Sequence, residues 1–112
     1  MNQYLLLFRG GNDSYAKFTE TELSDDQKKW ADWMGKLIHL GHSPMGQPLS
    51  RAAKVLKSGI YMDAPFGATP NDVIVGYVVV TALDFTSAVK AATDCPIIGL
   101  GGSVEIREIQ SE

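Results

Sequence analysis

The sequence predicts one α+β domain over residues 1–112, in which an antiparallel sheet carries both of its helices on one face. Two continuous apolar runs, at 4–8 and 73–81, are short and are typical of buried strands. A helical apolar period follows each run, so the order is strand, helix, one or two strands, strand, helix, strand. The length and a hydrophobic content of 45% fit a single core.

The first half of the chain is expected to form a strand at 4–8, a glycine-containing loop at 10–18 and one long helix. Two capping boxes compete for the start of this helix, at Thr19 and at Ser24, and we favour Ser24 because the apolar period begins after it. Gly41 is a natural end of the helix. The apolar stripe of the helix comprises Trp30, Trp33, Met34, Leu37, Ile38 and Gly41.

The middle of the chain is richer in turn signals. Residues 43–51 favour a turn-rich connection, 52–56 and 59–62 are weakly patterned strands, and 63–72 is a loop by composition. Residues 73–81 form the strongest strand because almost every residue there is apolar and most are β-branched.

The last third is expected to hold the second helix and an edge strand. Asp84 caps this helix, which ends at Pro96. Cys95 then lies at a helix C-terminus, where the negative end of the dipole raises its pKa. A glycine-rich loop at 97–103 leads to the final strand at 104–109. The loop is not a phosphate cradle, because a strand rather than a helix follows it.

Composition excludes several function classes. A net charge of −3 and a pI near 5.3 leave no basic field for a nucleic acid. The apolar runs are far shorter than the ~20 residues of a membrane helix, and no signal peptide is recognisable. A single cysteine excludes an intramolecular disulfide. We therefore expect a cytoplasmic domain without nucleic-acid or membrane partners. Because helices on one face leave the apolar strands open on the other, we also expect a homodimer that packs sheet against sheet.

Short motifs occur along the chain in an order that is similar to a known family. They are Tyr-Leu-Leu-Leu-Phe-Arg-Gly-Gly at 4–11, Trp-Ala-Asp-Trp-Met-Gly-Lys-Leu at 30–37, Gly41 with Gly-Gln-Pro-Leu at 46–49, Met-Asp-Ala-Pro-Phe at 62–66, Gly-Tyr at 76–77, Ala88-Val89 through Cys95-Pro96, and Gly-Gly-Ser-Val-Glu-Ile-Arg at 101–107. This set resembles the YCII-related superfamily, in particular its DGPF-type branch, named for an Asp-Gly-Pro-Phe motif. The resemblance implies a ferredoxin-like β-α-β-β-α-β fold that dimerises into a dimeric α+β barrel.

The sequence departs from the family pattern where chemistry would be expected. Ala64 replaces the glycine of the motif, and Ala68-Thr69-Pro70 stands where the family often has Glu-Thr-Lys. Some YCII-like proteins are thought to use a His–Asp pair, whose histidine would fall near Trp30. No histidine precedes His39, so the pair cannot be carried over to this chain.

Asp63 is the first candidate for a catalytic or ligand-binding residue, because it follows a strand and precedes Pro65. A turn aspartate that bonds its own backbone is the alternative. Trp30 and three other aromatic residues are candidates for a ligand pocket, or for core packing. Arg9 is suited to grip an anionic ligand or to form a structural ion pair at the strand end. The candidate aromatic residues are Trp30, Tyr61, Phe66 and Tyr77.

No metal or cofactor site is expected. His39 and His42 are three residues apart, but no third ligand is near them in sequence, so a surface pair is the better interpretation.

These observations favour a small-ligand-binding or regulatory homodimer with a modest cleft near Asp63 in each subunit. An alternative is an enzyme, a lyase or dehydrochlorinase-like catalyst of proton transfer on a small cyclic substrate, with Asp63 as base and His39 or Arg9 assisting. As a further alternative, the family resemblance implies an accessory role beside alternative sigma factors.

Overall fold

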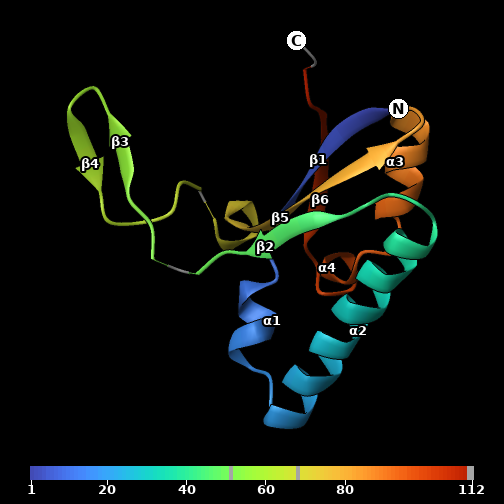
Figure 1. The fold of residues 1–112 in the computed structure, drawn as a ribbon. Helices are drawn as coiled ribbons and strands as arrows, with labels where there is room; N and C mark the ends of the chain where they lie inside the picture. Colours follow the sequence, from blue (N-terminus) through green and yellow to red (C-terminus); the bar gives the residue numbers. More distant parts are fainter. Residues whose placement is uncertain (51, 68, 111–112) are drawn as a thin grey trace.

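A computed structural model describes residues 1–50, 52–67 and 69–110, and a four-stranded antiparallel sheet in the order β2-β5-β1-β6 forms its centre (Figure 1). β1 (Asn2–Arg9) lies between β5 (Ile74–Ala82) and β6 (Ser103–Glu108). β2 (Met45–Pro48) pairs with β5 and forms the other edge.

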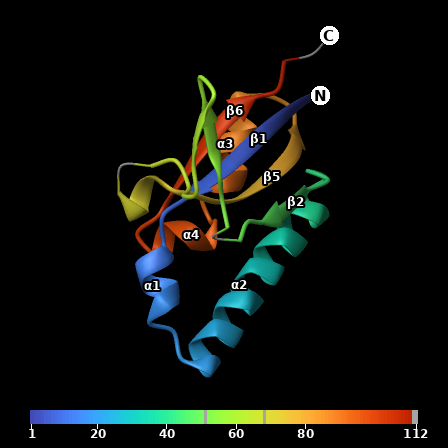
Figure 2. The same cartoon turned by 90° about the vertical axis from the view of Figure 1, so that its left-hand side faces the viewer.

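The helices gather on one face of this sheet, as Figures 1 and 2 show. They are α1 (Asn12–Ala16), α2 (Glu20–His39), α3 (Phe85–Ala92) and the short α4 (Pro96–Gly99). The 3₁₀ turn η1 (Pro70–Asp72) lies outside this layer, where the arm leads into β5. Side chains from α2, α3, α4 and the sheet share one hydrophobic core, which comprises Tyr4, Leu6, Phe8, Trp33, Leu37, Val78, Val80, Ala82, Ala88, Ala92, Cys95 and Ile97.

β1 alternates between the covered and the open face of the sheet. Tyr4, Leu6 and Phe8 are buried, whereas Leu5 and Leu7 point the other way and are only half-buried. Across the ladder Leu5 lies opposite Val79, so apolar side chains of both central strands share the open face. No helix of the described residues covers this face.

A separate hairpin projects from the body of the domain. β3 (Val55–Lys57) and β4 (Ile60–Met62) pair only with each other, and we call residues 52–67 the arm. Figure 2 shows the arm standing out in front of the sheet, away from α3. Its apolar side chains are largely exposed, with Phe66 at 76%. The other exposed apolar residues of the arm are Leu56, Ile60 and Met62.

The strands of the middle segment differ from the prediction. The expected connection at 43–51 contains β2. The two strands expected at 52–56 and 59–62 are present as the hairpin β3–β4, but they form the arm instead of joining the main sheet. Glycine and proline in β2 are turn signals, so the sequence does not indicate a strand there. Gly46 is nevertheless required for the pairing of β2 with β5. A Cβ at position 46 would lie 2.0 Å from the Tyr77 carbonyl oxygen, so only glycine allows this close pairing. Arg51 and Ala68 lie outside the described residues.

Two expected loops contain short helices. The loop predicted at 10–18 includes α1, and the loop predicted at 97–103 includes most of α4. Pro96 does not end α3, which stops at Ala92, but occupies the first turn of α4. A proline suits that position because its fixed φ is helical and the missing N–H is not needed there.

The long helix begins five residues earlier than predicted. Thr19, not Ser24, is its cap: the Glu22 N–H donates to Thr19 Oγ1 at 3.2 Å, and the Glu22 carboxylate accepts the Thr19 N–H at 3.3 Å. These reciprocal bonds provide acceptors for two backbone N–H groups that have no partner within the helix. The predicted end is confirmed, because Gly41 adopts φ +84° and the His42 N–H reaches the Leu37 carbonyl at 2.9 Å. Ile38, placed on the apolar stripe by its spacing, is instead 65% exposed.

The capping geometry predicts different costs for two hydroxyl deletions on one helix. Thr19→Ala is expected to lower the free energy of unfolding by about 1 kcal/mol, because it removes the cap. Ser24→Ala removes a hydroxyl inside the helix and is expected to change stability by less than about 0.5 kcal/mol. Urea unfolding of both variants, followed by circular dichroism, measures the difference. Equal costs would contradict the observed helix start.

Candidate functional site

A pocket of about 580 Å³ lies between α1, α2, β2 and β5 on the helical side of the sheet. This volume is in the range of pockets that hold small molecules. The lining is mainly apolar and aromatic, with a few polar groups. It comprises Phe8, Tyr15, Asp26, Gln27, Trp30, Met34, Gly46, Gln47, Pro48, Leu49, Ser50, Val75, Gly76, Tyr77 and Val78.

The aromatic wall of the pocket is continuous with the hydrophobic core. Phe8 meets Trp30 edge-to-face with ring centroids 5.1 Å apart, and Trp30 meets Trp33 in the same way at 5.8 Å. Trp33 is buried and donates its indole N–H to the Ala91 carbonyl at 3.1 Å. Trp30 is only half-buried and lines the pocket. Core packing therefore fixes Trp33, and Trp33 and Phe8 together fix the ring of Trp30.

Three polar groups from α1 and α2 lie together at the pocket. The Trp30 indole N–H donates to the Tyr15 hydroxyl oxygen at 3.1 Å. Burial raises the pKa of Tyr15 to about 12, and the nearby Asp26, through its charge and a hydrogen bond, acts in the same direction. The Trp30 hydrogen bond partly opposes this rise. The hydrogen bond between Trp30 and Tyr15 thus ties α1 to α2, and it places the Tyr15 hydroxyl near Asp26.

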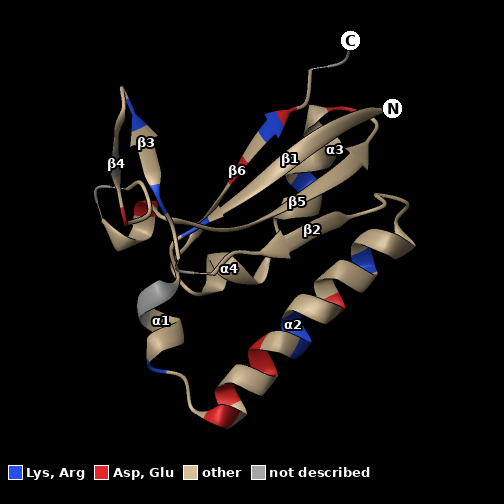
Figure 3. Ribbon diagram, turned by 60° about the vertical axis from the view of Figure 1, so that its left-hand side comes forward, with Lys and Arg blue, Asp and Glu red and all other residues tan. Residues whose placement is uncertain are grey.

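Asp26 is the buried carboxylate of the domain. Its exposed fraction is 7%, which makes it the one charged residue among the buried side chains of the described chain. Figure 3 shows that α2 is acidic along its first half, but the other acids on that half are exposed. Sequence reasoning missed Asp26, because a helix starting after Ser24 makes it an ordinary acid of the first turn. With the true start at Thr19, it lies on the face of Trp30, Trp33 and Leu37 at steps of four, three and four residues.

Only two of the sequence candidates meet at this pocket. Trp30 and Tyr77 both contribute to its lining, but the pairing of Tyr77 with Leu7 puts the tyrosine ring on the open face of the sheet. Phe66 and Asp63 lie on the arm, and the side chain of Tyr61 lies outside the described part of the structure. Asp63 is 70% exposed and forms an ion pair with Lys54, 3.2 Å between Oδ1 and Nζ. The pocket predicted from all four aromatic residues is therefore not assembled within this chain as far as the described residues show.

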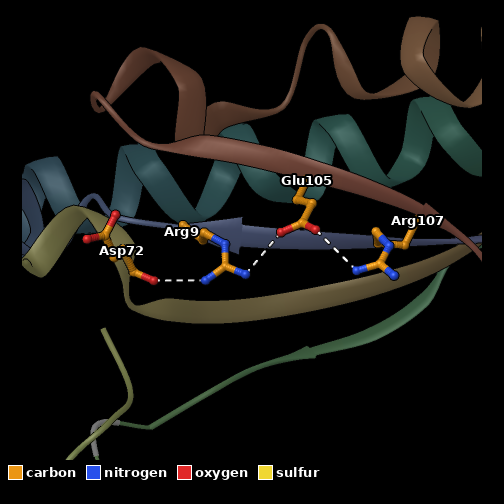
Figure 4. A network of polar contacts seen from close by, with 4 residues as sticks. All are labelled: Arg9, Asp72, Glu105 and Arg107. Carbon is orange, nitrogen blue, oxygen red and sulfur yellow. Dashed lines mark hydrogen bonds and ion pairs between the residues drawn. The ribbon is translucent and has the colours of Figure 1, made fainter. Parts of the chain in front are cut away.

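Arg9 belongs to a polar network at the end of the sheet (Figure 4). Its guanidinium donates to the Asp72 carbonyl oxygen at 2.9 Å and to Glu105 at 3.0 Å. Arg107 approaches the other oxygen of Glu105 at 3.4 Å. The Arg9 hydrogen bond is the main reason that the pKa of Glu105 is lowered. The structure thus gives Arg9 a structural ion pair, one of the two roles that its position suggested.

The remaining titratable candidates are held in structural contacts or are exposed. His39 is exposed, and His42 places Nδ1 2.9 Å from the Thr81 carbonyl oxygen. Burial, rather than a helix end, raises the pKa of Cys95 to about 12, so the thiol stays protonated at neutral pH. Within the described ranges, no three His, Cys, Asp or Glu side chains group as metal ligands. Among the same residues, every helix is too short or too polar to cross a membrane.

A comparison of the chain with known protein-family models finds no match, and a comparison with curated proteins finds no significant relative.

The Tyr15 environment predicts an alkaline transition. Because its pKa rises from 10.0 to about 12, the folded protein retains a proton that the unfolded chain releases. This contribution to stability is complete below pH 10 and is lost as the pH rises toward 12. Near-ultraviolet tyrosinate absorbance is expected to show a late titration step from Tyr15. Tyr15→Phe should remove that late step, whereas Tyr77→Phe should leave it. A late step that persists in Tyr15→Phe would refute the assignment.

Proposed function

We propose that this chain is a small-ligand-binding module that works as a homodimer, and that it is a DGPF-type member of the YCII-related superfamily. The observation that carries the binding function is the pocket between α2 and β2, which combines aromatic walls with the carboxylate of Asp26. A few polar groups in an apolar concavity are typical of sites that orient a small molecule.

The ferredoxin-like part of the proposal is supported by the element order. Leaving aside the arm and the short helices, the chain runs β1, α2, β2, β5, α3, β6, which is the β-α-β-β-α-β order of that fold. The ordered sequence motifs support the same family.

Two exposed apolar features support the homodimer. The open face of the sheet presents Leu5, Leu7, Tyr77 and Val79, and the arm exposes further apolar side chains. Exposed apolar surface on this scale is typical of an interaction site. A second copy related by a twofold axis covers both features at once, because each subunit then supplies a sheet face and an arm.

Catalysis by Asp63 receives less support from the geometry than binding does. A general base is made effective by burial or by neighbours that shift its pKa toward the working pH. Asp63 is 70% exposed and paired with Lys54, and it lies on the arm rather than at the pocket. The binding function is therefore the one that we propose.

Binding is tested by a thermal-shift screen of small metabolites that covers cationic, neutral and anionic classes. A ligand present at 100 times its Kd is expected to stabilise the protein by about 2.7 kcal/mol, which raises Tm by several degrees. Trp30→Ala, which removes a pocket wall, should abolish the shift, whereas Leu83→Ala, at a site 69% exposed, should retain it. A screen in which no class gives a saturable shift would refute the binding function.

The homodimer is tested by sedimentation equilibrium of the intact chain. We expect a mass of twice 12.2 kDa for the wild type. Val79→Glu places a charge on the open sheet face and should produce the monomer, because a buried unpaired charge is costly. Ile38→Glu, on an exposed part of α2, is the matched control and should remain dimeric. Circular dichroism verifies that both variants fold. A wild-type mass of one chain at the highest soluble concentration would contradict the proposal.

A further inference from the structure

We propose that the pocket beside Asp26 is selective for a small organic cation that carries at least one N–H group, such as a protonated aromatic amine or an amidine. This inference rests on the proposed ligand-binding function and adds the chemical class of the ligand. Its basis is the charge of the pocket, the aromatic surface and the hydrogen-bonding capacity of the carboxylate.

The charge of the pocket is unbalanced. Asp26 contributes a carboxylate, and the lining contributed by the described residues includes no Lys, Arg or His. No ion pair among those residues reaches Asp26. Its polar neighbour is the Tyr15 hydroxyl, which is neutral at physiological pH because its pKa is about 12. A carboxylate that is removed from water without a counter-ion is costly, and a bound cation would offset that cost.

The walls of the pocket suit a cation on an aromatic or otherwise planar framework. Phe8 and Trp30 contribute aromatic side chains to the lining. The faces of such rings attract cations, most strongly for tryptophan and more strongly away from water. The same faces pack well against a flat ring. A ligand with a cationic group and an apolar ring therefore finds both a carboxylate and aromatic side chains in one cavity.

The carboxylate distinguishes between kinds of cation. An ionised carboxylate is only an acceptor, so a ligand N–H adds a charge-assisted hydrogen bond that a quaternary ammonium cannot form. A metal ion is a poor fit, since the described residues hold no group of three His, Cys, Asp or Glu side chains. Protonated amines and amidines are the class that can use the charge of the carboxylate, its hydrogen-bond acceptors and the aromatic lining together.

The test compares three indole compounds that share a ring and differ in charge: tryptamine, which is cationic, tryptophol, which is neutral, and indole-3-acetate, which is anionic. Isothermal titration of the wild-type protein is expected to give a Kd for tryptamine at least about 10-fold lower than that for tryptophol, as a charge-assisted hydrogen bond implies. Indole-3-acetate should bind most weakly. This comparison needs no variant and so does not depend on whether a variant folds.

Two single-charge variants locate the effect. Asp26→Asn keeps the shape of the side chain and removes its charge, and it should raise the tryptamine Kd by about 10-fold or more, to the level of tryptophol. Asp25→Asn removes the same charge from the adjacent, exposed position and should leave the Kd unchanged. Circular dichroism and urea unfolding confirm that both variants keep the fold.

The outcomes separate the two proposals. Equal or tighter binding of tryptophol or indole-3-acetate overturns the preference for cations but supports a ligand-binding function. Equal losses in Asp26→Asn and Asp25→Asn overturn the role of the pocket, because they indicate a diffuse surface charge effect. The absence of saturable binding by tryptamine and by the smaller cation benzamidine also overturns the inference, whereas the binding function itself is decided by the broader screen of metabolite classes.

Discussion

The pairing of β1 between β5 and β6 is the constraint on which the rest of the structure depends. It orders a strand whose side chains alternate strictly, so that Tyr4, Leu6 and Phe8 enter the core and Leu5 and Leu7 do not. These inward residues belong to the core that α2, α3 and α4 share with the sheet. Phe8 shows this most directly, because it contacts both Trp30 and Trp33 and so sets where α2 crosses the sheet. The pocket forms where α2 diverges from β2 beyond this contact.

The same alternation explains why the domain has two unlike faces. When every residue of a strand is apolar, helices on one side of the sheet can bury only half of the side chains. The open face and the arm both expose apolar side chains to water. The described residues of a single chain cover neither surface. A hairpin whose strands pair only with each other gains little stability from the rest of the domain. The exposed apolar side chains of the arm are those expected of a segment that packs against another surface.

The long regular elements could be predicted from the sequence, because their signals are strong and local. The run of β-branched residues at 73–81 matches β5 within one residue at each end, and Asp84 caps α3 as its residue type indicates, accepting the Ser87 N–H at 2.8 Å. β2 and α1 could not be predicted in this way. Each is only four or five residues long, and each depends on distant partners: β2 on the backbone of β5, and α1 on a side chain of α2.

The candidate site is less predictable from the sequence than the fold, because the interpretation of Asp26 depends on where α2 begins. With Ser24 as the cap, Asp26 is one of several acids that favour a helix N-terminus. With Thr19 as the cap, it is a carboxylate on the buried face of an amphipathic helix, a position where acids are rare. Local chemistry points to Arg9 and Asp63, but their partners Glu105 and Lys54 lie far away in the chain or in weakly patterned sequence. The local sequence pattern therefore locates helices and strands well, but it does not identify the side chains that a candidate residue contacts.

Gly46 has a consequence for how this domain can diverge. The residue is held by the backbone of β5, which leaves no space for any side chain, so position 46 is closed to substitution as long as the sheet keeps its edge. Its neighbours Gln47 and Pro48 also line the pocket, but their side chains are exposed rather than packed in the core. One short strand thus combines an invariable anchor with adjacent positions that are free to vary. Selection acting on those positions can change what the pocket accepts without endangering the sheet that supports it.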